Sequence, residues 1–317
     1  MKDYSQLREE RLSRISSAQR ALFENSPPLD VLGVDGLRAG LAERLSQVPL
    51  APGVEFRDVV VDGPNGPVPT RIFTPPGGAV DSPVVVHIHA GGFVAGGGLD
   101  TWTGYNSILA TVSDAVVVAP DFRLPPEHRF PTGLGDNWAV LNWVAAGGDD
   151  AEWDASRIAI GGGCTGGNMA AVLSLMARDA GAPELSLQFL ESWPADLRND
   201  TRSQEENAEG YGLRQSDNAF VTSQYLAEPE DRWDWRASPL LAESVRGVAP
   251  ALITVGDWDV LRDEDIQYAN RLRDAGVPVE LQIDENVGHI GGDRQMQMKR
   301  LGEALRKAFG TSSADHE

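Results

Sequence analysis

The sequence predicts an α/β fold built on a mostly parallel central sheet, and three observations support this prediction. Short apolar, β-branched runs occur at residues 84–89, 115–119 and 158–160, separated by segments of helical or irregular character. Buried strands of parallel sheets form such continuous apolar runs because helices cover both faces of the sheet. A glycine-rich turn after the third run leads directly into a helix-forming stretch. The length of 317 residues suits one large core.

Two amphipathic helices are predicted at the start of the chain, over residues 4–24 and 34–48. There, charged residues alternate with apolar ones at helical spacing, and a Ser-Pro-Pro break separates the two segments. Two strands, at residues 54–61 and 68–74, follow. The cluster of Gly, Pro and Asn at 62–67 is typical of a turn, so these strands are expected to form a hairpin.

Three later apolar runs, at residues 185–190, 251–255 and 279–283, extend the predicted sheet. The intervening residues 192–235 are polar and irregular, and we expect them to pack with the N-terminal helices over the carboxyl edge of the sheet. The predicted organisation is an N-terminal helical cap segment (1–50), a first part of the core (51–191), a cap insertion (192–235) and a second part of the core (236–317).

Charge and composition exclude several partners. The formal net charge of −20 would repel a phosphate backbone, so no nucleic-acid partner is expected. No run of about 18 apolar residues is present, so stable membrane insertion is not expected either. The first residues lead into a charged helical pattern rather than a signal peptide, and the chain has a single cysteine, which cannot form an internal disulfide. These features predict a cytoplasmic protein.

The single cysteine, Cys164, lies where a hydrolase would carry its nucleophile. The segment 158–170, IAIGGGCTGGNMA, changes from a strand through glycines to a helix, so Cys164 is predicted on a sharp turn above the sheet. Gly162, Gly166 and Gly167 allow the turn to close and the helix to pack against the strand. The helix N-terminus directs free N–H groups and its positive dipole end towards the sulfur.

Two other interpretations of this segment remain open. A free cysteine often acts as a small buried apolar residue, although the strand, glycines and helix around Cys164 favour the nucleophile. The spacing of Gly161, Gly163 and Gly166 also matches a dinucleotide-binding fingerprint, with Glu191 as the acid that would bind a ribose. The other motifs of the chain weigh against that second interpretation.

The segment 89–93, HAGGF, follows the strand at 84–89 and suits an oxyanion hole. Consecutive glycines at the end of a strand can direct two N–H groups into a crevice, which makes the amides of Gly91 and Gly92 candidate donors. The amide of Thr165, the residue after the proposed nucleophile, is the third candidate. The alternative is a plain flexible loop.

No metal is expected, although His87 and His89 have the spacing of a ligand pair. A zinc site needs a third protein ligand, and the only other histidines are His128, His289 and His316.

A candidate base and a candidate acid follow two later strands. Asp259 comes just after the buried strand at 251–255, and His289 lies in a glycine-containing loop after the strand at 279–283. Either residue alone could be an ordinary surface residue. Together they complete the chain order nucleophile, acid, base, which is that of an α/β-hydrolase.

These motifs resemble those of the hormone-sensitive-lipase-like esterases, bacterial family IV of the α/β-hydrolases. The matching segments are HAGGF at 89–93, DFRLPPEHRFP at 121–131, GGGCTGGN at 161–168, ASPL at 237–240, DVLRDE at 259–264 and GH at 288–289. The resemblance covers nearly the whole chain. It implies an α/β-hydrolase core with a helical cap, no metal or organic cofactor, hydrolysis of carboxylic esters, and dimers in many relatives.

The chain departs from the family pattern around the nucleophile. Compared with the motifs H-G-G-G and G-D-S-A-G-G-N, cysteine replaces serine at Cys164, glycine replaces aspartate at Gly163, threonine replaces alanine at Thr165 and alanine replaces glycine at Ala90. A thiol ionises far more readily than a serine hydroxyl, and a neighbouring carboxylate would oppose that ionisation. Gly163 is therefore consistent with a thiolate nucleophile, and also with a pocket reshaped for another substrate. The motif residues His89, Ala90, Gly163 and Glu127 are expected to support the site.

The leading hypothesis is a hydrolase of carboxylic esters, thioesters or lactones. Cys164 would attack the carbonyl of a small-molecule substrate, His289 would move the proton and Asp259 would orient the imidazole. One alternative is a lyase, dehydratase or cyclase on the same fold with His289 as the base. The other is a small-molecule binding protein that has lost catalysis. A homodimer is possible for each.

Overall fold

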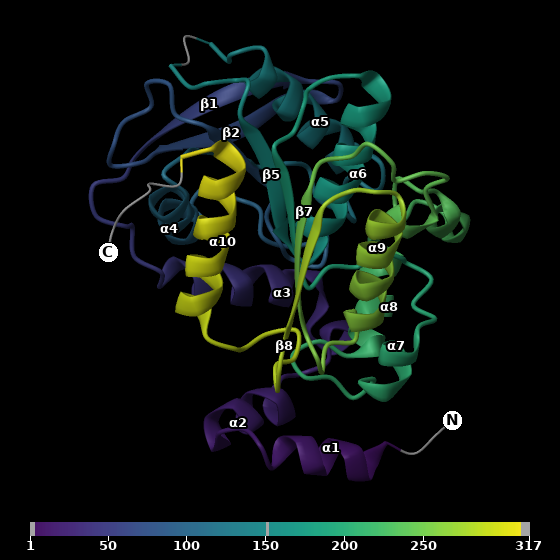
Figure 1. The fold of residues 1–317 in the computed structure, drawn as a ribbon. Coiled ribbons are helices and arrows are strands. Elements are labelled where there is room, and N and C mark those ends of the chain that lie inside the picture. Colours follow the sequence, from purple (N-terminus) through teal and green to yellow (C-terminus); the bar gives the residue numbers. More distant parts are fainter. Residues whose placement is uncertain (1–3, 150–151, 312–317) are drawn as a thin grey trace.

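The computed structural model describes residues 4–149 and 152–311, in which one eight-stranded sheet forms the centre of the molecule (Figure 1). The strands are β1 (Glu55–Gly63), β2 (Gly66–Thr74), β3 (Val84–His87), β4 (Val116–Pro120), β5 (Ile158–Gly163), β6 (Leu187–Glu191), β7 (Ala251–Gly256) and β8 (Val279–Asp284). Their order across the sheet is β1-β2-β4-β3-β5-β6-β7-β8. β2 is antiparallel to β1 and β4, and the pairs from β4 to β8 are parallel, which confirms the predicted fold class.

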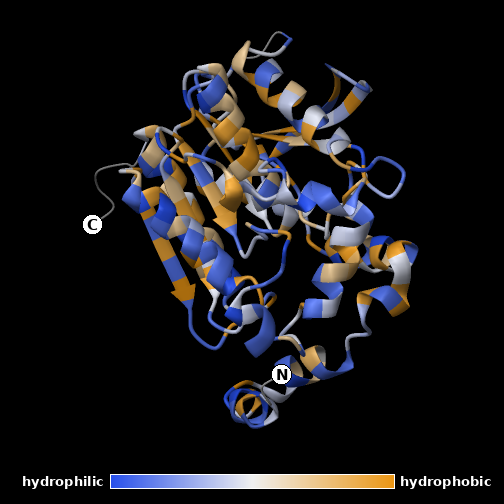
Figure 2. Cartoon of the chain, turned by 90° about the vertical axis from the view of Figure 1, so that its right-hand side faces the viewer, coloured by the Kyte–Doolittle hydropathy of each residue, from blue (hydrophilic) through white to orange (hydrophobic). Residues whose placement is uncertain are grey.

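Helices cover both faces of this sheet. One layer contains α4 (Thr103–Ser113) and α10 (Arg294–Phe309), and the other contains α5 (Thr132–Ala145), α6 (Thr165–Ala180) and α9 (Arg262–Asp274). Successive side chains of a strand point to opposite faces, so Val84 and Val86 pack in one core and Val85 packs in the other. Figure 2 shows apolar residues along the central strands and polar ones on the outer helical surfaces. Among the helices of residues 4–149 and 152–311, none is long and apolar enough to cross a membrane.

The predicted hairpin is confirmed, with a tight turn. β1 and β2 stay paired up to Gly63 and Gly66, so only Pro64 and Asn65 lie between the paired residues. β2 then pairs with β4 rather than with β3, the next strand in the chain. The sequence does not predict that β4 lies between β2 and β3, because the apolar pattern of a strand indicates its burial and not which strand it pairs with.

The first predicted helix, over residues 4–24, is wrong as one continuous element. The chain forms α1 (Ser5–Leu12) and α2 (Ser17–Asn25) instead. Ser16 has an extended backbone, and its side chain accepts a hydrogen bond from the amide of Gln19 at 3.2 Å. This N-cap satisfies the free amide of Gln19, so a new helix begins at Ser17. The spacing of apolar residues alone predicts one continuous helix instead.

The remaining polar segments are also more helical than predicted. The second N-terminal helix, α3 (Leu29–Ser46), is interrupted at Gly33, whose φ of 71° and ψ of 172° are not helical, so the part after the kink begins at the predicted residue 34 and a short extra turn precedes it. The insertion, expected to be irregular, contains α7 (Arg202–Glu206) and α8 (Gln215–Tyr225). α3 and α8 pack together around Leu41 and Val221, so tertiary contacts stabilise helices that have weak patterns of their own.

The N-terminal helices and the insertion are joined by polar contacts, and we call α1, α2, α3, α7 and α8 together the cap. The Arg11 side chain donates to Asn207 Oδ1 at 2.5 Å, and the amide of Leu29 donates to Asp217 Oδ1 at 2.7 Å. Figure 1 shows these helices at the end of the molecule towards which β7 and β8 run. The cap therefore lies over the carboxyl edge of the parallel strands.

Arg38 of α3 fastens the cap to the core. Its guanidinium donates to both carboxylate oxygens of Glu127, at 2.8 and 2.7 Å, and to the carbonyl oxygens of Val94 at 2.8 Å and Pro125 at 3.0 Å. The hydrogen bond from Arg38 lowers the pKa of Glu127 to about 2. Val94 follows the HAGGF loop directly, so Glu127 supports that loop through Arg38 rather than by touching it.

Replacing Arg38 with glutamine is expected to lower the free energy of unfolding at pH 7 by about 1–2 kcal/mol, because two backbone carbonyls lose a charged donor. Glu127→Gln should cost less than about 1 kcal/mol, since the carboxylate is 55% exposed. The Glu127 contribution is present above its unfolded pKa of 4.5 and fades as the pH falls towards 2. Denaturant titrations from pH 3 to 7 measure the free energy of unfolding of each variant. Glu43→Gln, on the same helix as Arg38, is the control. An unchanged pH dependence in Glu127→Gln would contradict it.

Candidate active site

Cys164 occupies a strained turn between β5 and α6. Its backbone φ of 48° and ψ of −123° are rare for a residue with a side chain. The turn is held by a hydrogen bond from the Cys164 amide to the Glu191 carbonyl at 2.8 Å, and the Cys164 carbonyl accepts from the Gly167 amide at 3.0 Å. The side chain is only partly buried. This geometry suits an accessible nucleophile better than an apolar filler.

Close backbone packing locks this turn to the HAGGF loop. A Cβ atom on Gly162 or Gly166 would lie 2.1 or 2.0 Å from the carbonyl oxygen of Ile88, so neither position can carry a side chain. Ile88 immediately precedes the loop. The same packing removes the dinucleotide interpretation, because protein backbone fills the space over Gly166 that a pyrophosphate would need.

Asp259 and His289 meet at the carboxyl edge of the sheet. His289 Nδ1 lies 3.0 Å from Asp259 Oδ2, and the other carboxylate oxygen accepts from the Leu261 amide at 3.0 Å. Asp259 is completely buried. Burial alone would lower the pKa of His289, but attraction to Asp259 and Cys164, with hydrogen bonds to both side chains, raises it well above its usual range. A protonated imidazole is therefore stabilised between the two groups.

The segment between α7 and α8 contacts the backbone of both of these residues, a link that sequence reasoning missed. The Asn207 side chain donates to the Asp259 carbonyl at 2.8 Å, and the His289 amide donates to the Tyr211 carbonyl at 2.8 Å. Tyr211 also packs against Trp258 in a small apolar cluster. Asn207 and Tyr211 lie in the polar insertion, where no sequence signal marks a residue that binds a distant backbone.

The amides of Gly91, Gly92 and Thr165 remain available as donors. Within residues 4–149 and 152–311, no hydrogen bond uses any of the three. The loop bends through positive φ angles of 147° at Gly91 and 60° at Gly92, and the Ala95 amide closes it by donating to the Gly91 carbonyl at 2.9 Å. Free backbone donors beside a nucleophile are what a developing oxyanion requires.

His89 and Ala90 shape this loop. The His89 ring stacks on Phe122 with 4.3 Å between ring centroids, and its Nδ1 lies 3.0 Å from the Ala90 carbonyl oxygen. Burial lowers the pKa of His89 and takes that of His87 to about 3. Both rings are therefore neutral at physiological pH. In the part of the chain that the structure describes, no three potential ligand side chains gather in a way that could hold a metal ion.

A carboxylate from the neighbouring strand lies beside Gly163. Gly163 pairs with Glu191 across β5 and β6, and a Cβ atom on Gly163 would lie 3.7 Å from Glu191 Oε2. The carboxylate near position 163 therefore belongs to β6 and not to the turn itself. The sequence marked Glu191 only as a ribose-binding acid, because the register of two parallel strands is not encoded locally.

Two further buried carboxyls lie beneath Asp259. Glu264 accepts from the Asp196 amide at 3.1 Å and the Gln204 side chain at 3.0 Å, and Asp265 accepts from the Trp193 amide at 3.4 Å. Burial raises the pKa of Glu264 to about 8 and that of Asp265 well above its usual range, with repulsion from Asp259 adding to the shift of both. Glu264 therefore remains largely protonated at neutral pH and limits the negative charge around Asp259.

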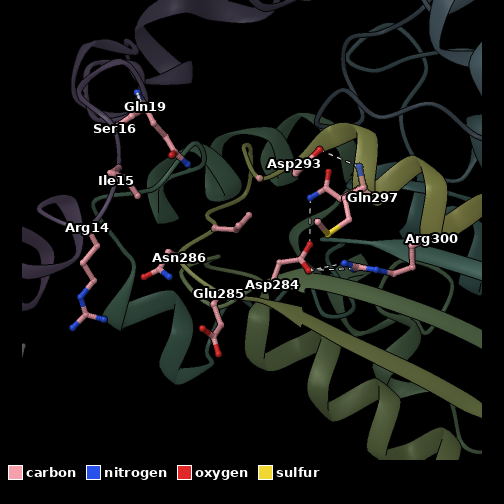
Figure 3. Close-up of a pocket in the computed structure, with 13 residues that line it drawn as sticks. Arg14, Ile15, Ser16, Gln19, Asp284, Glu285, Asn286, Asp293, Gln297 and Arg300 are labelled. Atoms are coloured by element: carbon pink, nitrogen blue, oxygen red, sulfur yellow. Dashed lines mark hydrogen bonds and ion pairs between the residues drawn. The ribbon is translucent and has the colours of Figure 1, made fainter.

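One groove lies beside the loop that carries His289. It has a volume of about 440 Å³ and lies between the turn joining α1 to α2 and the start of α10 (Figure 3). Asp284 in its wall pairs with Arg300 at 3.1 Å and accepts from Gln297 at 3.3 Å. The groove is lined by neither Cys164 nor Asp259.

Comparisons with known proteins agree with this architecture. A family model described as the α/β-hydrolase fold matches residues 85–291. The esterase LipI of Mycobacterium tuberculosis is 37% identical over 261 residues, covering 81% of each chain, and the carboxylic ester hydrolase LipN of that organism is 35% identical, covering 92% of this chain and 86% of LipN. The crystal structure of EstE1, a thermostable carboxylesterase from a metagenomic library, superimposes with a TM-score of 0.81 at 30% identity, covering 89% of this chain and 99% of EstE1.

The match to the family model spans more than half of the chain, and the relatives share most of its length. The mostly parallel eight-stranded sheet, with helices on both faces, is the architecture of this fold. The chain therefore belongs to the α/β-hydrolase fold family, among the hormone-sensitive-lipase-like esterases that its motifs resemble.

Proposed function

We propose that the protein is a cysteine-dependent hydrolase of small carboxylic esters and thioesters. The observation that carries this proposal is the 3.0 Å contact between His289 Nδ1 and Asp259 Oδ2, together with the attraction of Cys164, which helps to raise the pKa of the imidazole. A nucleophile whose base is oriented by a buried carboxylate is the arrangement of covalent acyl transfer. Relatives named as esterases support the class of reaction.

The reaction begins with the Cys164 sulfur. His289 takes its proton, the thiolate forms a bond to the substrate carbonyl carbon, and the carbonyl electron pair moves to the oxygen. The amides of Gly91, Gly92 and Thr165 stabilise that oxyanion. When the carbonyl re-forms, the bond to the leaving group breaks and His289 gives the leaving group its proton.

Water completes the cycle. His289 accepts a proton from a water molecule, whose oxygen attacks the thioester on Cys164. The bond between carbon and sulfur breaks, the carboxylic acid leaves, and the thiol and imidazole return to their starting state. The net reaction consumes one ester and one water and releases an acid and an alcohol or thiol, so the triad needs no cofactor.

Leaving-group chemistry narrows the substrate class. A thiolate leaves a tetrahedral intermediate more readily than most alkoxides, so attack on an unactivated ester tends to reverse. Substrates with a good leaving group avoid this problem. We therefore propose activated esters, thioesters and strained lactones as preferred substrates.

The compartment and the oligomeric state of the enzyme are proposed from separate observations. The only thiol of the chain is its nucleophile, which favours a reducing compartment such as the cytoplasm. A homodimer is supported by β8, which lies at the edge of the sheet that the described residues form and exposes Ile283. Such an edge is a surface on which a second copy can add.

Intact-mass spectrometry tests the covalent step. Mixing the protein with p-nitrophenyl acetate should release a burst of p-nitrophenol and add the mass of one acetyl group to the chain, because the acyl-cysteine forms before water attacks it. The control is protein whose thiol has first been blocked with iodoacetamide, which should show neither signal. Absence of both adduct and turnover with unblocked protein would eliminate this mechanism.

A further inference from the structure

A small cavity lies at the start of the HAGGF loop, and the proposed mechanism does not use it. Its volume is about 20 Å³, and it is bounded by the ends of β3 and β4, the loop at residues 96–99 and the start of α4. The polar side chains in its wall include those of His87, His89, Trp102 and Asn106. A water molecule needs a cavity of at least about 10–15 Å³, so this cavity can hold one molecule of that size.

Each of these four side chains has a buried polar atom without a hydrogen-bond partner among the described residues. The atoms are His87 Nδ1, His89 Nε2, Trp102 Nε1 and Asn106 Oδ1. Asn106 is a neighbour of His87, since it opposes the effect of burial on the pKa of that ring, but no hydrogen bond of normal geometry joins Nδ1 to Oδ1. Buried polar groups almost always have a partner, so four of them around one cavity indicate a bound molecule.

The surrounding contacts decide which of these atoms donate and which accept. His89 Nδ1 lies 3.0 Å from the Ala90 carbonyl oxygen, which can only accept, so Nδ1 carries the proton and Nε2 is a bare acceptor. Asn106 Oδ1 also accepts, whereas Trp102 Nε1 can only donate. The neutral His87 ring can carry its proton on Nδ1 and donate as well. The bound molecule must therefore both donate and accept.

Water meets these requirements. Its two protons match His89 Nε2 and Asn106 Oδ1, and its two lone pairs match the N–H groups of Trp102 and His87. A metal cation would be repelled by the indole N–H, and an ammonium ion could not accept from it. In the part of the chain that the structure describes, no group of three ligand side chains is placed to hold a metal ion.

The cavity is connected to the oxyanion loop through His89. A Cβ atom on Gly96 would lie 2.3 Å from the Ala90 carbonyl oxygen and 2.6 Å from His89 Nδ1, so the returning loop packs directly on this contact. The Ala90 carbonyl and the Gly91 amide belong to one planar peptide group, so the direction of one sets the direction of the other. His89 therefore orients the amide of Gly91, one of the proposed oxyanion donors.

We propose that this cavity binds one water molecule, which joins Trp102 and Asn106 at α4 to His89 and thereby holds the Gly91 amide in place. Trp102 and Asn106 are then positioning residues for the oxyanion hole, because they act through the water and His89 and do not touch the substrate. The water site stands on the cavity and its buried atoms. Its effect on catalysis rests on the proposed function.

The water site is tested without substrate. A high-resolution crystal structure of the wild type should show one peak of density about 2.7–3.2 Å from both Trp102 Nε1 and His89 Nε2. In Asn106→Leu the leucine side chain should fill the cavity, so the peak should vanish and the nitrogen-15 resonance of His89 Nε2 should move. No such peak in the wild type, or an unmoved resonance in Asn106→Leu, overturns the water site.

The positioning role is tested by kinetics with p-nitrophenyl acetate. Trp102→Phe keeps an aromatic ring but loses the N–H group, and it should lower kcat by about 10-fold, less than the loss of about 100- to 1000-fold that removal of an oxyanion donor causes. KM should stay nearly unchanged, because the oxyanion forms only in the transition state. Melting temperatures of the variants check that they are folded.

The matched control is Trp138→Phe, which removes the N–H group of a half-buried tryptophan on α5, in the opposite helical layer, and should leave kcat unchanged. An unchanged kcat in Trp102→Phe, or an equal loss in Trp138→Phe, overturns the positioning role. If the wild type does not turn over the ester at all, the proposed function fails, and the density and the His89 resonance still decide whether the water site exists.

Discussion

Replacing Cys164 with alanine is expected to lower kcat/KM for p-nitrophenyl acetate by about 10⁴- to 10⁶-fold, the cost of removing a catalytic nucleophile. The variant should still fold, because alanine removes only the sulfur atom of a partly exposed side chain. It should also form no acyl adduct by intact mass. Steady-state kinetics on purified variant and wild type, with melting temperatures as the check on folding, measure this effect.

Alanine at this position also separates the remaining hypotheses. Activity that survives in Cys164→Ala would show that the sulfur is not the nucleophile and would favour a lyase or cyclase with His289 as the base. Cys164→Ser is the matched variant, since it keeps the size of the side chain and the His289–Asp259 pair. We expect it to lose more activity on thioesters than on simple oxygen esters. The serine hydroxyl is a poorer nucleophile than the thiol, which lowers the rate on both kinds of substrate. It is also a poorer leaving group, so its attack on an oxygen ester is less readily reversed.

The second large effect is expected for Asp259→Asn, which should lower kcat/KM by about 10⁴-fold, as loss of the orienting carboxylate does in other triads. The Leu261 amide donates to one carboxylate oxygen of Asp259, and an asparagine there would keep its one acceptor oxygen on that amide. Its NH2 group would then face Nδ1 and could only donate, so the imidazole takes the wrong tautomer or orientation. Attraction to Asp259 is the first of the interactions that raise the pKa of His289, so this pKa should fall in the variant.

The sign of the pH effect follows from that shift. In the wild type the protonated imidazole persists to a higher pH than an ordinary histidine would allow, and in Asp259→Asn it should lose its proton at a lower pH. When kcat/KM is measured from pH 5 to 9, the rise on the acid side of the pH profile should therefore occur at a lower pH in the variant than in the wild type. Asp274→Asn, an exposed carboxylate at the end of α9, is the control. Unchanged rates and limbs in Asp259→Asn would contradict its role.

The sequence predicted those elements whose local pattern is strong. The apolar runs that became β3, β4, β5, β6, β7 and β8 are buried on both faces or follow Gly and Pro boundaries, so burial and turn chemistry point to the same structure. The cap was harder to predict. α7 and α8 are polar helices that depend on partners elsewhere in the chain, whereas α2 begins at a capping serine that periodicity does not register.

By itself, the sequence determined the fold class and the three residues on which the chemistry is proposed to depend, because each is marked by its own neighbours. Cys164 lies between glycines, and Asp259 and His289 each follow an apolar strand. Only the tertiary structure placed the Glu191 carboxylate beside Gly163, brought Asn207 and Tyr211 to the backbone of Asp259 and His289, and buried Glu264 below them. These contacts depend on strand register and on the packing of distant segments, and no local pattern of residues encodes either.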